Sequence, residues 1–215
     1  GNANNLLYNE SCLDAQMRRQ IYGDIYDDSM WLIDLVENLL SVTRIEEGRM
    51  QIRQSAELVD EVIKEALKHT GQSRTGRTIK VEEEDELILA KMDARLIVQV
   101  LINLIGNAVK YTPQGTDITV RVKKEKAENA ERSQVIISVC DLGNGIPDDR
   151  KERVFDMFYT GSDQVADSRR SLGLGLGLCR SIINAHGGKI WISDNIPHGA
   201  VVTFTLPAEE VALNE

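Results

Sequence analysis

The segment Asn103-Leu104-Ile105-Gly106-Asn107-Ala108-Val109-Lys110-Tyr111 carries two asparagines four residues apart, with a lysine close behind them. In a helix this spacing places all three side chains on one face. Asp141-Leu142-Gly143-Asn144-Gly145-Ile146-Pro147 follows about thirty residues later, with an aspartate ahead of two glycines that let backbone approach a ligand closely. Either pattern alone is weak evidence. In this order they indicate a nucleotide site, in which amides and a lysine face phosphates and a metal while the acid accepts a hydrogen bond from a base edge.

The composition limits the classes of protein to consider. The chain has 215 residues, enough for one large domain or for one domain and an appendage. Its net charge of −9 argues against non-specific binding to nucleic acid or to anionic membranes. Three cysteines, Cys12, Cys140 and Cys179, lack metal-ligand spacing, so we interpret them as free thiols used in packing. No apolar run approaches the ~20 residues that would span a bilayer.

Residues 1–49 form the first expected unit. Residues 14–47 predict one long helix, because apolar side chains recur at spacings of three, four and seven from Ile21 to Ile45. Such a stripe fits an ordinary amphipathic core helix. It also fits half of a helical hairpin that dimerises into a bundle, with Leu6 and Leu7 near the end of a partner helix that is mostly missing. We favour the partial hairpin.

Residues 50–215 form the second expected unit. Helical periodicity is present in 58–67, a helix from Asp93 to Tyr111 is capped by that aspartate, and a further helix runs to His186. Short or alternating apolar runs predict strands at 50–54, 78–81, 87–90, 118–122, 135–139, 190–192 and 201–206. Several strands covered on one face by about three helices make an α+β fold, a two-layer α/β sandwich.

At this point the chain resembles the sensor histidine kinases. Asn103–Tyr111 matches their asparagine box and Asp141–Ile146 their first glycine box. Val154–Tyr159 is similar to the phenylalanine box, Gly173–Leu176 to the second glycine box, and Gly199–Pro207 to the closing strand. Five matches in the family's order make the resemblance specific.

The resemblance covers about residues 50–207 and implies the GHKL, or Bergerat, ATP-binding fold of chaperone ATPases, type II topoisomerases and MutL. It implies ATP and Mg²⁺ as ligands. The nucleotide contacts that it implies are Asn103, Asn107, Lys110, Tyr111, Asp141, Gly143, Gly145, Ile146, Phe158, Tyr159, Arg170, Gly173, Leu174, Gly175, Leu176 and Thr203. Phe155 and Phe158 also fit a packing role.

Each implied role has a physical reason. Asn107 offers a neutral oxygen to Mg²⁺, which often takes few protein ligands and fills its shell with phosphate and water. Asn103 would orient phosphate or metal-bound water, and Lys110 supplies a point charge to phosphate. Asp141 would accept a hydrogen bond from the adenine amino group. The glycines of the second glycine box would present backbone N–H groups at a helix start. After Tyr159 the family often has an arginine where this chain has Thr160, and Arg169 and Arg170 could supply the missing cation.

One position separates kinase from ATPase. ATPases of this fold place a glutamate one turn before the metal asparagine, as general base for water, and here that position is Asn103, which cannot accept a proton usefully near neutral pH. The favoured function is therefore transfer of the γ-phosphoryl group to a histidine rather than hydrolysis. The alternatives are a GHKL-type ATPase and a nucleotide-sensing scaffold that transfers nothing.

The resemblance also implies partners and location. None of the three histidines, His69, His186 and His198, suits the acceptor, so we expect the acceptor upstream of Gly1, and we interpret His186 as a structural helix end. The implied partners are the chain's own dimerisation domain, a second copy of the chain, and the receiver domain of a response regulator. This region would be soluble and cytoplasmic in a membrane-bound sensor most similar to the potassium-sensing Kdp-type kinases. Residues 160–172 predict a mobile lid.

Overall fold

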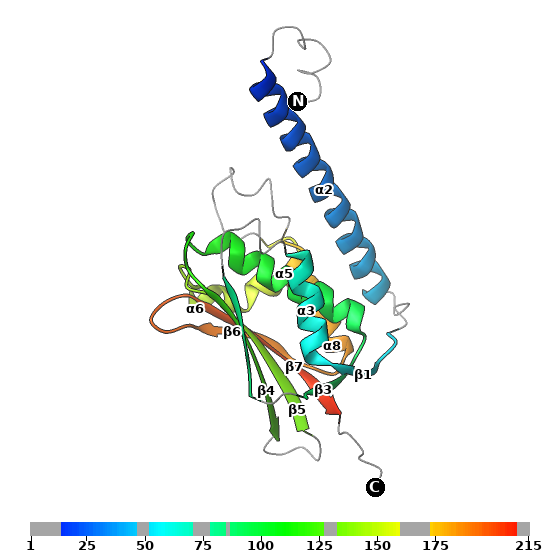
Figure 1. Cartoon of the computed structure of the whole chain (residues 1–215). Coiled ribbons are helices and arrows are strands. Elements are labelled where there is room, and N and C mark those ends of the chain that lie inside the picture. Colours follow the sequence, from blue (N-terminus) through cyan, green and yellow to red (C-terminus); the bar gives the residue numbers. More distant parts are fainter. Residues whose placement is uncertain are drawn as a thin grey trace.

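The computed structural model describes residues 14–46, 52–70, 78–84, 87–126, 133–159 and 173–209. Figure 1 shows a long helix standing on an α/β body. The elements in chain order are α2 (Ala15–Glu46), β1 (Ser55–Leu58), α3 (Val59–His69), β2 (Ile79–Glu83), β3 (Leu89–Met92), α5 (Ala94–Tyr111), β4 (Ile118–Lys126), β5 (Ser133–Cys140), α6 (Asp148–Lys151), η2 (Arg153–Phe155), α8 (Gly175–Ala185), β6 (Ile190–Asp194) and β7 (Ala200–Glu209).

The strands within the described ranges form one seven-stranded sheet in the order β1-β3-β7-β5-β4-β2, with β6 also paired to β7. β7 pairs with three strands: its residues 201–207 pair with β5, residues 200–204 with β6, and residues 208–209 with β3. The β2–β4 pair is parallel and the others are antiparallel. Because Cys140 pairs with Val201, the end of β5 meets the start of β7.

Helices α3, α5 and α8 cover one face of this sheet (Figure 1). Alternate strand residues point into the layer between sheet and helices, as Val135, Ile137 and Val139 of β5 do. Six side chains of α5 are buried there: Ile97, Val100, Leu101, Leu104, Ile105 and Ala108. The predicted α+β fold with two layers is confirmed, and the core leaves one side of α5 available for polar residues.

Two local predictions were wrong. The first strand is 55–58 rather than 50–54, because its partner β3 pairs Ser55 with Met92 and Leu58 with Leu89. Asp93 precedes α5 as predicted, but its side chain caps no helix N–H. Its carboxylate instead accepts a hydrogen bond from the backbone N–H of Arg53 at 3.2 Å. A tertiary partner has therefore displaced the local one.

Helix α2 confirms the long helix predicted over 14–47. Leu32, Val36 and Leu40, at four-residue intervals, are each about half exposed. The expected partner around Leu6 and Leu7 lies outside the described residues, so the hairpin remains a prediction. None of the helices in the described ranges combines the length and the apolar character that crossing a membrane requires.

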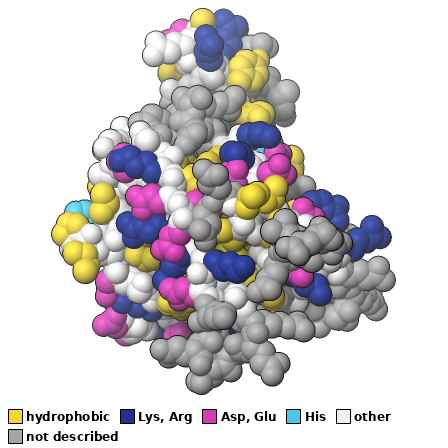
Figure 2. Space-filling view, turned by 60° about the horizontal axis from the view of Figure 1, so that its bottom comes forward, with side chains coloured by type: hydrophobic (Ala, Val, Ile, Leu, Met, Phe, Trp, Pro, Cys, Tyr) yellow, Lys and Arg dark blue, Asp and Glu magenta, His cyan; other side chains and the backbone are white. Residues whose placement is uncertain are grey.

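Charges of both signs are mixed on the surface. Figure 2 shows basic and acidic side chains interspersed over the face in view. Arg121 pairs with Glu82 at 2.9 Å between β4 and β2, and both side chains are more than half exposed. Exposed pairs of this kind contribute little to stability. Because the two signs of charge are mixed, the face shown in Figure 2 has no large patch of one charge.

Candidate nucleotide-binding site

Helix α5 holds the three polar residues that the sequence places on one face. Asn103 and Asn107 are half-buried, and Lys110 is exposed. Leu104 and Ala108, directly after the two asparagines, are buried in the core. The two amides therefore lie at the border between core and surface, where a ligand can reach them while the apolar side of the helix holds their position.

The loop after β5, Asp141–Pro147, is bound to the start of β7, and we call it the aspartate loop. Asp141 Oδ1 accepts hydrogen bonds from the backbone N–H groups of Gly143, at 2.8 Å, and Ala200, at 3.2 Å. The N–H of Asp141 donates to the carbonyl of Ala200 at 2.9 Å. No hydrogen bond from the described residues reaches Oδ2. The carboxylate is thus oriented by backbone, with one oxygen left for a ligand.

The aspartate loop packs directly on the last turn of α5. A Cβ at Gly143 would lie 2.6 Å from the backbone oxygen of Tyr111, so only glycine permits this approach. Gly145, at φ +71°, lies beside the backbone of Gly199. The predicted glycines therefore bring Asp141 to the helix that carries the asparagines.

The segment Gly173–Gly175 opens α8, and we call it the α8 start. Gly173 has φ +65°, and a Cβ there would lie 2.4 Å from the backbone oxygen of Tyr159. The N–H of Phe158 donates to the carbonyl of Gly173 at 3.0 Å. A Cβ at Gly175 would lie 3.6 Å from Asn103 Oδ1. The N-terminus of α8, where unpaired N–H groups favour anions, therefore lies beside Asn103.

Aromatic side chains stand near both ends of this arrangement. Tyr111 is 54% exposed, with the Lys110 ammonium nitrogen 4.8 Å from its ring centroid. Phe158 is 63% exposed and has φ +65°, which is unusual for a residue other than glycine. Tyr159 is half-buried, with the Arg153 guanidinium 4.9 Å from its ring centroid. Phe155, by contrast, is buried and takes the packing role.

The remaining predicted contacts are placed differently. Ile146 and Leu176 are partly buried against the core, and Leu174 is 4% exposed, so their side chains pack. Thr203 alternates with the core residues of β7 and points away from the helices, where its hydroxyl lies 3.0 Å from that of Ser138. The structure does not bring Thr203 to the other predicted residues. Arg170 and the predicted lid, 160–172, lie outside the described residues.

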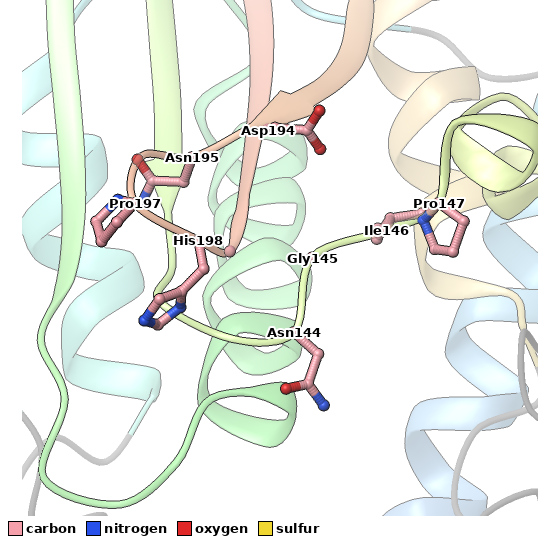
Figure 3. A pocket seen from close by; sticks show the side chains of 9 residues that line it. Asn144, Gly145, Ile146, Pro147, Asp194, Asn195, Pro197 and His198 are labelled. Atoms are coloured by element: carbon pink, nitrogen blue, oxygen red, sulfur yellow. The ribbon is translucent and has the colours of Figure 1, made fainter.

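Three residues near Asp141 were not named from the sequence as contacts. An open depression of about 360 Å³ lies between the aspartate loop and the turn linking β6 to β7. Figure 3 shows the side chains that line it. From this turn, Asn195 Nδ2 donates to the carbonyl of Asp141 at 2.7 Å, and His198 Nδ1 lies 3.2 Å from the carbonyl of Gly143. Ala200, which binds the carboxylate, follows them. No sequence pattern connects this turn to Asp141, because the contact depends on how β5 pairs with β7.

A buried thiol lies next to the side chain of Asn103. Cys179 of α8 is fully buried, and burial raises the pKa of its thiol to about 12, against a smaller opposing effect of the Asn103 side chain. The Nδ2 atom of Asn103 is itself buried and has no hydrogen-bond partner among the described residues. Asn103 is therefore held between α5 and α8, with its Nδ2 turned toward the buried thiol and its Oδ1 beside the α8 start.

The histidines have separate roles. His186 ends α8 and is buried: its Nδ1 donates to the carbonyl of Ile182 at 2.8 Å, and its Nε2 accepts from the N–H of Asp93 at 3.0 Å. His69 is exposed on α3, with Nε2 3.3 Å from a carboxylate oxygen of Glu65. The prediction that His186 is a structural helix end is confirmed.

The part of the chain that the structure describes contains no cluster of three or more His, Cys, Asp or Glu side chains arranged for a metal ion. Asn107 is the predicted metal ligand, and one amide oxygen suits a cation that arrives already bound to phosphate and water. The donor set thus fits a nucleotide-borne Mg²⁺, for which the protein supplies few ligands.

The family model described as histidine kinase-, DNA gyrase B- and HSP90-like ATPase matches residues 92–210, more than half of the chain. The chain belongs to this family. The matched region contains α5, the aspartate loop, the α8 start and β7, and it is a histidine kinase-type catalytic domain.

Individual relatives agree with this assignment. The chain is 39% identical over 209 residues to the sensor protein KdpD of Clostridium acetobutylicum, covering 97% of this chain and 23% of KdpD. The catalytic domain of histidine kinase ThkA is 31% identical, with TM-score 0.57 over 72% of this chain and 95% of that one. ThkA in complex with the response regulator TrrA is 26% identical, with TM-score 0.67 over 97% of this chain and 57% of that one. The chain thus spans less than a quarter of its KdpD relative.

Proposed function

We propose that residues 50–215 bind Mg-ATP and transfer its γ-phosphoryl group to a histidine of a dimerisation domain, for relay to the receiver domain of a response regulator. One observation carries the proposal. The oriented carboxylate of Asp141 lies at one end of α5, and the N-terminus of α8 opens beside Asn103 further back along the same helix. Asn107 lies between them on the same face.

The aspartate loop is the proposed adenine end. Asp141 Oδ2 accepts a hydrogen bond from the amino group of adenine, whereas guanine presents a carbonyl at that position and is repelled. Tyr111, exposed beside the loop, offers its ring to the base or the ribose. Gly143 and Gly145 keep the loop backbone close to the base.

The α8 start is the proposed phosphate end. Its N–H groups and the exposed ammonium of Lys110 attract the phosphates. Asn103, whose Oδ1 lies beside the α8 start, would orient phosphate or metal-bound water. Bound Mg²⁺ would neutralise charge on the triphosphate, and Asn107 would give it one oxygen ligand. Arg170 belongs to this end of the proposal.

Transfer to histidine is favoured over hydrolysis because Asn103 replaces the base that would activate water. The acceptor imidazole nitrogen forms a bond to the γ-phosphorus while the bond to the bridging oxygen breaks, and ADP leaves. None of the chain's three histidines suits this role: His186 uses both nitrogens in the core, His198 contacts Gly143, and His69 lies on α3. The proposed acceptor therefore lies outside the 215 residues.

Residues 1–49 are the proposed remainder of the dimerisation domain. The exposed apolar line of Leu32, Val36 and Leu40 supports contact between α2 and other helices, in its own hairpin or in a second copy of the chain. The likeness to KdpD supports a potassium-sensing type of sensor, attached to a membrane with this region in the cytoplasm.

Thermal unfolding with nucleotides tests the binding half of the proposal. ADP with Mg²⁺ should raise the melting temperature, because a ligand that binds only the native state stabilises it, and GDP should raise it less. Equal shifts with both would contradict the adenine role of Asp141. Labelling with γ-³²P ATP tests the transfer half: a dimeric bundle carrying the acceptor histidine should gain base-stable, acid-labile phosphate. Fast ATP hydrolysis without such labelling would favour the ATPase alternative.

A further inference from the structure

The turn between β6 and β7 supports the carbonyl of Asp141 through one side chain. Asn195 Nδ2 donates to this carbonyl at 2.7 Å, and Asn195 Oδ1 accepts from the N–H of Ile196 at 3.0 Å. A carbonyl only accepts and an N–H only donates, so the two contacts together determine the orientation of the amide. The N–H of Asn195 also donates to the carbonyl of Gly199 at 3.0 Å, which fixes the turn.

We infer that Asn195 is a positioning residue for base selectivity, acting through Asp141 rather than by touching the nucleotide. This inference rests on the proposed function of Asp141. The peptide that Asn195 holds leads directly to Gly143, whose N–H binds Asp141 Oδ1, so the contact of Asn195 with the carbonyl also keeps this N–H in place against the carboxylate. Figure 3 shows Asn195 on the turn, across the depression from Asn144 and Gly145 of the aspartate loop.

The other supports of Asp141 cannot replace Asn195. Its N–H and Oδ1 are bonded to the backbone of Ala200, and Oδ1 is also bonded to the N–H of Gly143. These bonds hold one edge of the residue against β7. Among the hydrogen bonds of the described residues, the carbonyl of Asp141 receives its bond from Asn195 alone. Without it, the peptide between Asp141 and Leu142 can rotate and draw the N–H of Gly143 away from Oδ1, which leaves the carboxylate held by the N–H of Ala200 alone among the described residues and free to turn Oδ2 out of line with the base.

The test compares two nucleotides that differ at the atom Asp141 reads. ADP carries the 6-amino group, and inosine diphosphate carries a carbonyl there, with the same ribose and phosphates. Asn195→Asp is nearly isosteric but turns an oxygen toward the Asp141 carbonyl, so the hydrogen bond is lost. Calorimetric titration of the 215-residue chain with Mg²⁺ should show ADP affinity reduced about fivefold and inosine diphosphate affinity reduced less than about twofold.

The control is Ile196→Ala, on the same turn. The side chain of Ile196 is 89% exposed, and the substitution keeps the backbone N–H that donates to Asn195 Oδ1. It should keep the parent's preference for ADP. A merely structural role for Asn195 would reduce both affinities in Asn195→Asp alike, and this result would overturn the inference. Should that variant melt below the assay temperature, the same ratio is measured with Asn195→Ala, which adds no charge.

The outcomes separate the inference from the proposed function. A parent chain that does not prefer ADP overturns the role of Asp141, and the inference with it. A parent that prefers ADP, with the preference unchanged in Asn195→Asp and Asn195→Ala, overturns the role of Asn195 alone.

Discussion

The aspartate loop and the α8 start lie along the same helix but are held in different ways. The aspartate loop is bonded to the start of β7 through the backbone of Asp141, through its carboxylate and through Asn195. In the described residues, the α8 start is joined to the preceding segment by the bond from Phe158 to Gly173, and it meets α5 at Asn103. In the proposed function, selectivity for the base would thus rest on a preorganised loop, whereas phosphate binding would rest on a helix terminus and side chains of α5.

The strongest test of this difference is Gly199→Ala. A Cβ at Gly199 would lie 2.0 Å from the carbonyl oxygen of Asp141, at φ +112°. Strain and overpacking together should lower the free energy of unfolding by about 2–4 kcal/mol. Urea denaturation measures this. The matched control is Gly187→Ala, at φ +77° with nothing within 4 Å, where only the strain of about 1 kcal/mol applies. Equal losses in both variants would show that the β7 junction does not hold the loop rigidly.

Asp141→Ala should separate base recognition from phosphate binding. Loss of a charged acceptor costs about 1.5–3 kcal/mol, so the affinity for ADP should fall roughly 10- to 150-fold. The affinity for GDP should not fall and should rise modestly, because the guanine carbonyl no longer faces a carboxylate while the contacts at the α8 start remain. Titration calorimetry with both nucleotides measures the ratio. An equal loss for ADP and GDP would mean that Asp141 supports the site without reading the base.

Asn107→Asp tests the side of α5 that is proposed to meet the phosphates. A negative charge there repels the nucleotide when Mg²⁺ is absent and attracts the metal when it is present. A single charge–charge interaction near a protein surface contributes on the order of 1–4 kcal/mol, so the Mg²⁺ dependence of ADP affinity should steepen by about tenfold or more. Asn144→Asp, an exposed change of the same charge on the aspartate loop, is the control. An unchanged Mg²⁺ dependence would remove Asn107 from the metal.

The smallest expected effect is the pH dependence of stability that comes from the buried Cys179 thiol of α8, next to Asn103. The Cys179 thiol has a pKa raised to about 12 by burial, so it stays protonated in the native state while an unfolded thiol ionises near its ordinary value of 9.0. The unfolded state then binds fewer protons, and stability falls as pH rises through 9. At pH 9.5 the loss should be about 1 kcal/mol relative to pH 8. Cys179→Ala should flatten this part of the stability profile, and an equally steep profile would contradict the burial of the thiol.

Local patterns were sufficient for several features of this protein. The spacing of Asn103, Asn107 and Lys110 predicted a shared helix face, because helical geometry depends on nearby residues alone. The same holds for the long helix in 14–47 and for Gly143, whose close approach to α5 requires a residue without a side chain. The order of the boxes then identified the family, which the match over residues 92–210 confirmed.

Tertiary structure decided what local patterns could not. The carboxylate of Asp93 does not cap α5, because it accepts a hydrogen bond from the backbone N–H of Arg53, forty residues away. Thr203 points away from the predicted site because the register of β7 against β5 places it opposite Ser138. Asn195 reaches Asp141 across 54 residues only because β6, β7 and β5 lie side by side. Such contacts arise from strand pairing between distant segments, and the spacing of residues within either segment carries no record of them.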